Sequence, residues 1–244
     1  MSDRRFARTE MLVGSAALAR LAGASVAVFG IGGVGSYAAE ALARAGVGRL
    51  TLVDHDVIDV TNINRQIHAL TETVGAAKTE TMARRIHSIN PACAVREIRA
   101  FYQPEVAEQF FPEPYDYVLD AVDTVTAKID LAVQCHRRGI PLIASMGAAN
   151  KLDPALFEVM DIYRTTGDPL ARILRKKLKE RGIPHLRVVC SRERPRTPEA
   201  GEAQPAAGRN SVPASISFVP SAAGLIMAGA VIRDLLNIRV EVSS

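Results

Sequence analysis

The stretch that decides the fold begins with Ala24–Phe29 (ASVAVF), continues as GIGGVG from Gly30 to Gly35, and ends with Ser36–Ala45 (SYAAEALARA). The first six residues are a β-branched run typical of a buried strand, and the Ala-rich segment has the apolar spacing of a helix. Leu50–Val53 (LTLV) has the composition of a second strand, and Asp54 ends it. The stretch therefore predicts a βαβ unit whose first turn is rich in glycine.

Further strands and helices alternate downstream of this unit. We expect helices at 78–90 and 126–138, and strands at 94–98, 117–119, 141–145 and 216–219. Alternation of this kind predicts an α/β fold, a Rossmann-like, doubly wound, mostly parallel sheet with flanking helices. We expect one domain over residues 1–244, with a nucleotide-binding core at 24–153, a basic segment and mobile loop at 164–213, and a C-terminal strand and buried helix at 214–244.

The glycine turn carries the first chemical signal. Glycines let the backbone approach a phosphate, and the following helix N-terminus supplies N–H donors and partial positive charge. The carboxylate of Asp54, nineteen residues after the last glycine, can accept hydrogen bonds from both hydroxyls of a ribose. This fingerprint alone fits NAD, FAD and ATP. The candidate nucleotide-binding residues of this group are Gly30, Gly32, Gly33, Gly35 and Asp54.

A polar cluster after Asp54 favours ATP among these nucleotides. An adenylation transition state gathers charge on the α-phosphate and the departing pyrophosphate, so it needs fixed cationic and amide donors. A carboxylate at the end of a later strand can hold Mg²⁺ on the phosphates. Each residue taken singly also fits a solvated loop charge, and the argument depends on their order. The candidates are Asp56, Asn62, Arg65, Gln66 and Lys78 for the nucleotide, Arg65 and Lys78 also for catalysis, and Asp123 for catalysis and for Mg²⁺.

Composition predicts a folded protein of the cytoplasm. Hydrophobic residues make up 48% of the chain, and tryptophan is absent, which suits a sheet core of aliphatic side chains. The charged N-terminal segment is not followed by an apolar stretch, so we expect no secretory signal. Pro220 and serines interrupt the apolar run at 216–232, so we expect no membrane span. Cys93, Cys135 and Cys190 are too far apart for a disulfide framework or a zinc pair.

Positive charge is concentrated in one segment. Arg164–Arg196 contains eleven Lys or Arg and three Asp or Glu, a local net charge of +8. The whole chain carries +4, so the remainder carries −4. The segment is either a solvated helix face or a surface for a polyanion. Pro195–Pro213, which follows, is rich in Pro, Gly and Ala and is expected to be a mobile surface loop.

Several longer sequence motifs resemble those of a known superfamily. GIGGVG, LVDHDVIDVTNINRQIHA, GAAKTE and DAVDT resemble the ubiquitin-activating, ThiF, MoeB and HesA superfamily of adenylating enzymes. RFARTEMLVG, NINRQIHAL and SFVPSAAGLIMAGAVIRDLL resemble its tRNA threonylcarbamoyladenosine dehydratase subgroup. The resemblance implies ATP-dependent cyclisation of the modified adenosine in tRNA, with ATP and Mg²⁺ as cofactors. It further implies a homodimer in which Arg8 reaches the partner subunit's ATP, and a tRNA substrate that the basic segment suits.

Three alternatives stay open at this point. An activator of a ubiquitin-like sulfur carrier of the MoeB, ThiF or HesA kind predicts a working thiol or zinc cysteines. Cys190 lies on an apolar run, where a lone cysteine is usually a packing residue. An NAD-binding Rossmann protein would not need Arg65, Lys78 and Asp123 together, and a non-catalytic tRNA-binding module is the third alternative. A sulfur-transfer partner of the cysteine desulfurase type also stays open.

Overall fold

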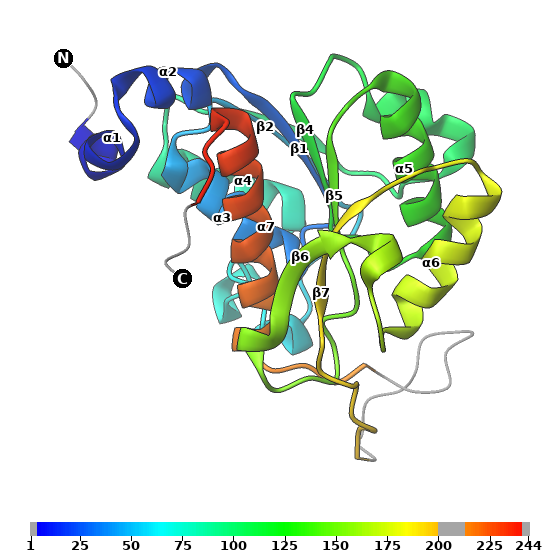
Figure 1. The fold of residues 1–244 in the computed structure, drawn as a ribbon. Helices are drawn as coiled ribbons and strands as arrows, with labels where there is room; N and C mark the ends of the chain where they lie inside the picture. Colours follow the sequence, from blue (N-terminus) through cyan, green and yellow to red (C-terminus); the bar gives the residue numbers. More distant parts are fainter. Residues whose placement is uncertain (1–3, 200–212, 241–244) are drawn as a thin grey trace.

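Figure 1 presents the chain in a computed structural model that describes residues 4–199 and 213–240. Its centre is a seven-stranded sheet in the order β3-β2-β1-β4-β5-β7-β6. Every neighbouring pair is parallel except β6 with β7. The doubly wound, mostly parallel fold expected from the sequence is confirmed. The strands are β1 (Ser25–Phe29), β2 (Arg49–Val53), β3 (Ala94–Ile98), β4 (Tyr117–Asp120), β5 (Leu142–Ser145), β6 (Phe157–Asp161) and β7 (Arg187–Ser191).

Helices cover both faces of the sheet. One face packs against α3, α4 and α7, and the other against α5, α6 and the 3-10 segment η4. Each face has its own hydrophobic core, which explains why β1, buried along its whole length, is apolar rather than alternating. The helices are α1 (Ala7–Val13), α2 (Ser15–Gly23), α3 (Gly35–Ala45), α4 (Lys78–Ile89), α5 (Val125–Arg138), α6 (Pro169–Glu180) and α7 (Phe218–Leu236). The 3-10 segments are η1 (Arg4–Phe6), η2 (Val60–Asn62), η3 (Thr71–Thr73), η4 (Pro104–Phe110), η5 (Pro154–Leu156) and η6 (Ile162–Arg164).

Local signals place the ends of several helices. α3 and α5 end at Gly46 and Gly139, whose φ angles of 95° and 67° are in the left-handed region that glycine adopts readily. Asp168 is the N-cap of α6, and its side chain accepts a hydrogen bond from the backbone N–H of Ala171. The predicted helices at 78–90 and 126–138 form within one residue of their expected ends.

The strand expected at 216–219 is wrong, because these residues lead into and begin α7. Pro220 fits this position because the first turn of a helix needs no backbone N–H from it. The helix packs on α3 at Gly224, where an added Cβ would lie 2.2 Å from the carbonyl oxygen of Val34. A sequence pattern cannot show this contact, because the two residues are far apart in the chain. Packing on α3 stabilises the helix over the strand that the local residues predicted.

The C-terminal helix α7 is the segment on which the expectation of no membrane span depends. Within residues 4–199 and 213–240, α7 is long and apolar enough to cross a membrane by length and composition alone. However, 56% of its most apolar window is buried inside the fold against α3 and the sheet, as in the core helix of a soluble domain. The expected loop at Pro195–Pro213 lies outside the described residues except for 195–199 and Pro213, which form neither helix nor strand.

Candidate functional site

A cavity of about 670 Å³ opens at the carboxyl ends of the central strands. It lies where the chain order reverses, between β1 and its neighbour β4, which is the usual ligand position in a doubly wound sheet. All but two of the sequence-predicted site residues line it. They are Gly30, Gly32, Gly33, Asp54, Asp56, Asn62, Arg65, Gln66, Lys78 and Asp123.

The glycines of the first turn have different roles. Gly30 has a φ angle of 84°, and a Cβ there would lie 2.7 Å from the carbonyl oxygen of Ala121. A Cβ on Gly35 would lie 1.8 Å from the carbonyl oxygen of Gly30, so Gly35 packs beneath the turn and does not line the cavity. Its part in nucleotide binding, which the sequence predicted, stays a prediction. Gly32 has open space where its Cβ would be, which leaves its backbone accessible to a phosphate.

The carboxylate of Asp54 is held by the backbone at the end of β2. One oxygen accepts a hydrogen bond from the N–H of Ile31 at 2.7 Å, and the other from the N–H of Asp56 at 2.9 Å. These bonds fix the carboxylate beside the glycine turn. An acceptor in that position suits ribose hydroxyls, as the sequence predicted.

The two predicted cations reach the cavity from different segments. Lys78 is the first residue of α4, and its ammonium donates to a carboxylate oxygen of Asp56 at 2.7 Å. The guanidinium of Arg65 donates to the carbonyl of Thr61 at 2.9 Å, and its side chain lies across Gly33. Burial lowers the pKa of Arg65 from its usual value, which marks the cost of holding this cation away from water.

Amide and hydroxyl groups complete the lining. The side-chain oxygen of Asn62 accepts from the N–H of Asp59 at 3.2 Å and so caps η2, the short helix that precedes Arg65. Among the described residues, the buried atoms Gln66 Oε1 and Ser215 Oγ have no hydrogen-bond partner. Buried polar atoms without partners are costly, and their position on the cavity wall fits groups that bind a ligand.

A buried ion pair adjoins this cavity, whose lining includes Lys128, and sequence reasoning missed it. Lys128 on α5 donates to a carboxylate oxygen of Asp120 at 3.0 Å, with their side chains 2% and 1% exposed. Asp120 ends β4, and its carboxylate also accepts from the N–H of Val122 at 3.1 Å, in the loop that leads to Asp123. Burial is the main cause that raises the pKa of Asp120. A lysine on the apolar face of a helix was the available sequence signal.

Arg8 lies far from this cavity within its own chain. It is exposed on α1, whose preceding residues Arg5 and Phe6 lie beside Ile89 at the C-terminal end of α4. Lys78 is at the opposite end of α4, and twelve helical residues span about 18 Å. The chain by itself therefore does not bring Arg8 to the predicted site.

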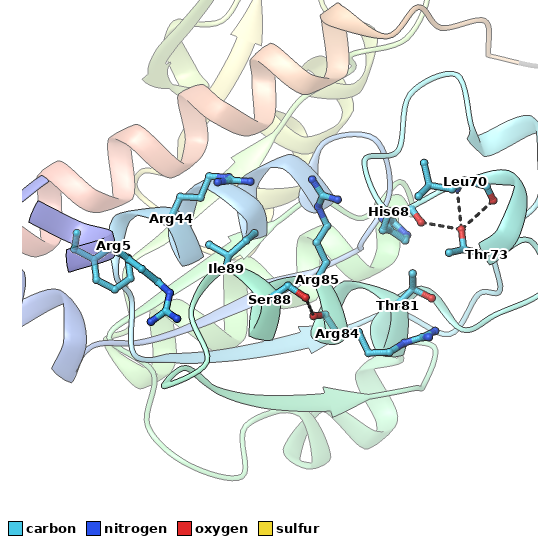
Figure 2. A pocket seen from close by; sticks show the side chains of 11 residues that line it. Arg5, Arg44, His68, Leu70, Thr73, Thr81, Arg84, Arg85, Ser88 and Ile89 are labelled. Atoms are coloured by element: carbon cyan, nitrogen blue, oxygen red, sulfur yellow. Dashed lines mark hydrogen bonds between the residues drawn. The ribbon is translucent and has the colours of Figure 1, made fainter. Parts of the chain in front are cut away.

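A second cavity of about 730 Å³ lies along α4 (Figure 2). Figure 2 shows Arg5 and Ile89 at one end and His68 and Thr73 at the other. Four arginines line it, but Arg44 and Arg85 both pair with Glu40 at 2.6 Å. His68 is 2% exposed, and both of its ring nitrogens lack partners among the described residues. Burial, with the nearby charges of Lys78 and Arg85, lowers its pKa to about 4.

The three cysteines are free and buried in the described structure. Cys190 lies on β7 and is 2% exposed. Burial raises the pKa of its thiol to about 11, so the thiolate needed for nucleophilic attack is scarce at neutral pH. Its surroundings agree with a packing role.

The fold and the cavity together define a Rossmann-like α/β protein whose glycine turn lines a cavity at the carboxyl edge of the sheet. The chain belongs to the ThiF family, whose model matches residues 6–243. A relative from Bacillus subtilis, tRNA threonylcarbamoyladenosine dehydratase, is 49% identical over 241 residues, which cover 96% of this chain and 95% of the relative.

Solved structures of the same kind of enzyme are similar to this chain along nearly its whole length. The Escherichia coli tRNA threonylcarbamoyladenosine dehydratase in complex with ATP is 39% identical, with a TM-score of 0.87, covering 96% of this chain and 94% of that one. The same enzyme has been solved with AMP. The molybdopterin-synthase adenylyltransferase of Escherichia coli is more distant, at 32% identity over 65% of this chain and 61% of that protein. The sulfur-carrier alternative therefore has the weaker support.

Proposed function

We propose that this protein is an ATP-dependent tRNA threonylcarbamoyladenosine dehydratase. The observation that carries the proposal is the cavity in which Asp54, Arg65, Lys78 and the glycine turn converge. The full-length similarity to dehydratases from two bacteria supports the choice of substrate. ATP fits the residues present, because the unpartnered buried oxygen of Gln66 and the open backbone at Gly32 face the same cavity.

The proposed reaction has two steps. A carboxylate oxygen of the threonyl group attacks the α-phosphorus of ATP, and the bond to pyrophosphate breaks. An oxygen or nitrogen of the carbamoyl group in the same modification then attacks the activated carbonyl and closes a five-membered ring. AMP leaves and one proton is released, so that water is lost overall at the expense of ATP. Positioning and charge stabilisation are the protein's tasks in both steps, and neither needs a cysteine nucleophile.

The chain's residues divide these tasks by position. Asp54 orients the ribose at the end of β2, while Gly32 and the N-terminus of α3 bring backbone N–H groups to the phosphates. Arg65 and Lys78 stabilise the charge that develops on phosphate oxygens, and Asp56 holds Lys78 at the cavity wall. Asp123, exposed on the cavity after β4, would hold Mg²⁺, which supplies further neutralisation of phosphate charge when bound.

One assay tests the proposed function. Pyrophosphate release from ATP is measured with tRNA that carries threonylcarbamoyladenosine, with unmodified tRNA, and with no tRNA. We expect release only with the modified tRNA, together with a loss of 18 mass units from the nucleoside. Release with a ubiquitin-like sulfur carrier instead, or tighter binding of NAD than of ATP by calorimetry, would overturn the proposal.

We further propose a homodimer that completes each site. Arg8 and the nucleotide cavity lie at opposite ends of α4, so a two-fold arrangement with antiparallel α4 helices brings each Arg8 toward the other subunit's phosphates. Met11 and Leu12 on α1 are 87% and 84% exposed, which fits a surface that a second copy covers. A guanidinium supplied in trans can stabilise phosphate charge and makes turnover depend on assembly.

Mixing two inactive variants tests this arrangement. Arg8→Ala and Lys78→Ala subunits, once exchanged, form hybrid dimers with one intact site. An equal mixture should recover about a quarter of wild-type turnover, since half of the dimers are hybrids and each has one working site of two. No recovery after confirmed subunit exchange would remove Arg8 from the partner's site.

We propose that tRNA phosphates bind along α6 and the strand that follows. The helix starts at the cavity, because Leu170 lines it. Lys176 and Lys179 on the helix, and Arg181 directly after it, are exposed. Arg175 belongs to the same basic segment, but its guanidinium donates to the carbonyl of Thr165 at 2.7 Å and so binds within the fold. Backbone contacts of this kind add affinity without reading sequence.

A salt series tests the α6 surface. Reversing Lys176, Lys179 and Arg181 to Glu should lower the slope of log affinity against log salt by about two to three, with ATP affinity unchanged. A triple variant that binds tRNA like wild type across the series would leave these residues as a solvated helix face.

A further inference from the structure

Lys151 is a fully buried cation outside the predicted site. Its side chain is 0% exposed, and its ammonium donates to the carbonyl oxygen of Gly147 and to a carboxylate oxygen of Asp168, the latter at 3.4 Å. The other oxygen of Asp168 accepts from the N–H of Ala171 and caps α6. Burying an ammonium is costly unless it is paired, so this contact holds the segments that supply its oxygens.

The segment held most directly is a wall of the nucleotide cavity. Gly147 lines the cavity, and a Cβ on it would lie 3.2 Å from Asp168 Oδ2 and 3.8 Å from Lys151 Nζ. The backbone of this wall therefore rests on the buried ion pair. Gly147 follows β5, whereas the ribose carboxylate Asp54 follows β2, on the other side of β1 and β4. The wall thus belongs to the half of the cavity opposite the ribose.

The neighbouring residue extends this support to another part of the wall. Asn150, with a φ angle of 61°, exchanges two hydrogen bonds with the backbone of Ala214, both 2.8 Å long. Its carbonyl also accepts from the N–H of Arg196 at 2.8 Å. Pro213 and Ser215, on either side of Ala214, line the cavity. A shift of the segment from Gly147 to Lys151, which contains Asn150, would therefore move several parts of the same wall.

From this geometry we infer that Lys151 is a positioning residue whose ammonium takes the place of a bound monovalent cation. Carbonyl and carboxylate oxygens are the ligands that such a cation prefers, and the ammonium meets one of each. The inference rests on the proposed function, because it assigns this wall to placing the threonyl carboxylate against the α-phosphate. Lys151 does not touch the reacting atoms.

Replacing Lys151 with a neutral residue that offers oxygen tests the inference. Lys151→Gln opens space beside the two oxygens, and Lys151→Met opens it without a new oxygen. Arg137→Gln, on the exposed face of α5 and away from the proposed tRNA surface, is the control. Pyrophosphate release and thermal unfolding are measured with either K⁺ or tetramethylammonium as the monovalent cation. Wild type and the control should respond equally to both.

In tetramethylammonium, Lys151→Gln should lose about tenfold to a hundredfold in kcat with little change in the KM for ATP, since misplacement of the wall affects the reacting geometry. K⁺ should restore its turnover and raise its Tm, and should do neither for Lys151→Met. Wild-type kcat in Lys151→Gln without K⁺, or no K⁺ effect on its Tm, would overturn the inference. If wild type itself fails on modified tRNA, the proposed function fails, whereas the Tm comparison still tests the cation site.

Discussion

The buried pair of Lys128 and Asp120 gives a sharp test of how the floor of the cavity is held. Asp120→Asn would leave the Lys128 ammonium in a site where its side chain is 2% exposed, with no carboxylate at 3.0 Å. Breaking such a pair by removing one partner typically costs about 3–5 kcal/mol in free energy of unfolding. A domain is usually stable by only about 5–15 kcal/mol, so this loss is large.

The expected costs are unequal for the two partners. Lys128→Met leaves a carboxyl whose pKa burial already raises, so it can take up a proton and become neutral. We therefore expect Lys128→Met to cost less than Asp120→Asn. The double variant should recover about 2 kcal/mol or more relative to Asp120→Asn, because no buried charge remains unpaired.

Urea unfolding at pH 7, followed by circular dichroism, measures these differences. Lys177→Met is the matched control, because its pair with Glu180 is 46% exposed on both sides and should change stability by about 0.5 kcal/mol or less. Equal costs for Asp120→Asn and the double variant would refute the reasoning, since the penalty would then come from lost packing rather than from an unpaired charge.

Three further outcomes are expected. Arg65→Ala should lower turnover about 10²–10³-fold with an unchanged melting curve, while Arg137→Ala on the exposed face of α5 should match wild type in the pyrophosphate assay. Gly35→Ala should abolish ATP binding by calorimetry, because its Cβ would lie 1.8 Å from the carbonyl oxygen of Gly30 and the turn would have to move; wild-type affinity would contradict this. Because the pKa of His68 is about 4 in the fold and 6.5 otherwise, the unfolded chain binds the extra proton first as pH falls below 6.5. Free energy of unfolding should therefore drop by up to about 3 kcal/mol toward pH 4, and His68→Phe should lessen that drop in urea titrations; equal drops in both proteins would count against a buried neutral His68.

The sequence determined the features that depend on neighbouring residues. The βαβ unit, the glycine turn and the ends of α4 and α5 follow from apolar spacing and from glycines that allow turns and caps. The cavity residues Asp54, Arg65 and Lys78 could also be predicted from the sequence, because each lies within a few residues of a strand or helix end at one edge of the sheet.

The tertiary structure decided what depends on distant contacts. β6 joins the sheet antiparallel to β7, and residues near 218 become helix because α7 packs closely on α3. The buried ion pairs of Lys128 with Asp120 and of Lys151 with Asp168 could not be predicted from residue spacing. Each pair forms because the fold buries both charges, and a local sequence pattern does not show that a charged side chain is buried. The separation of Arg8 from the nucleotide cavity along α4 is likewise a property of the folded chain, and it is the reason the proposed site needs a second subunit.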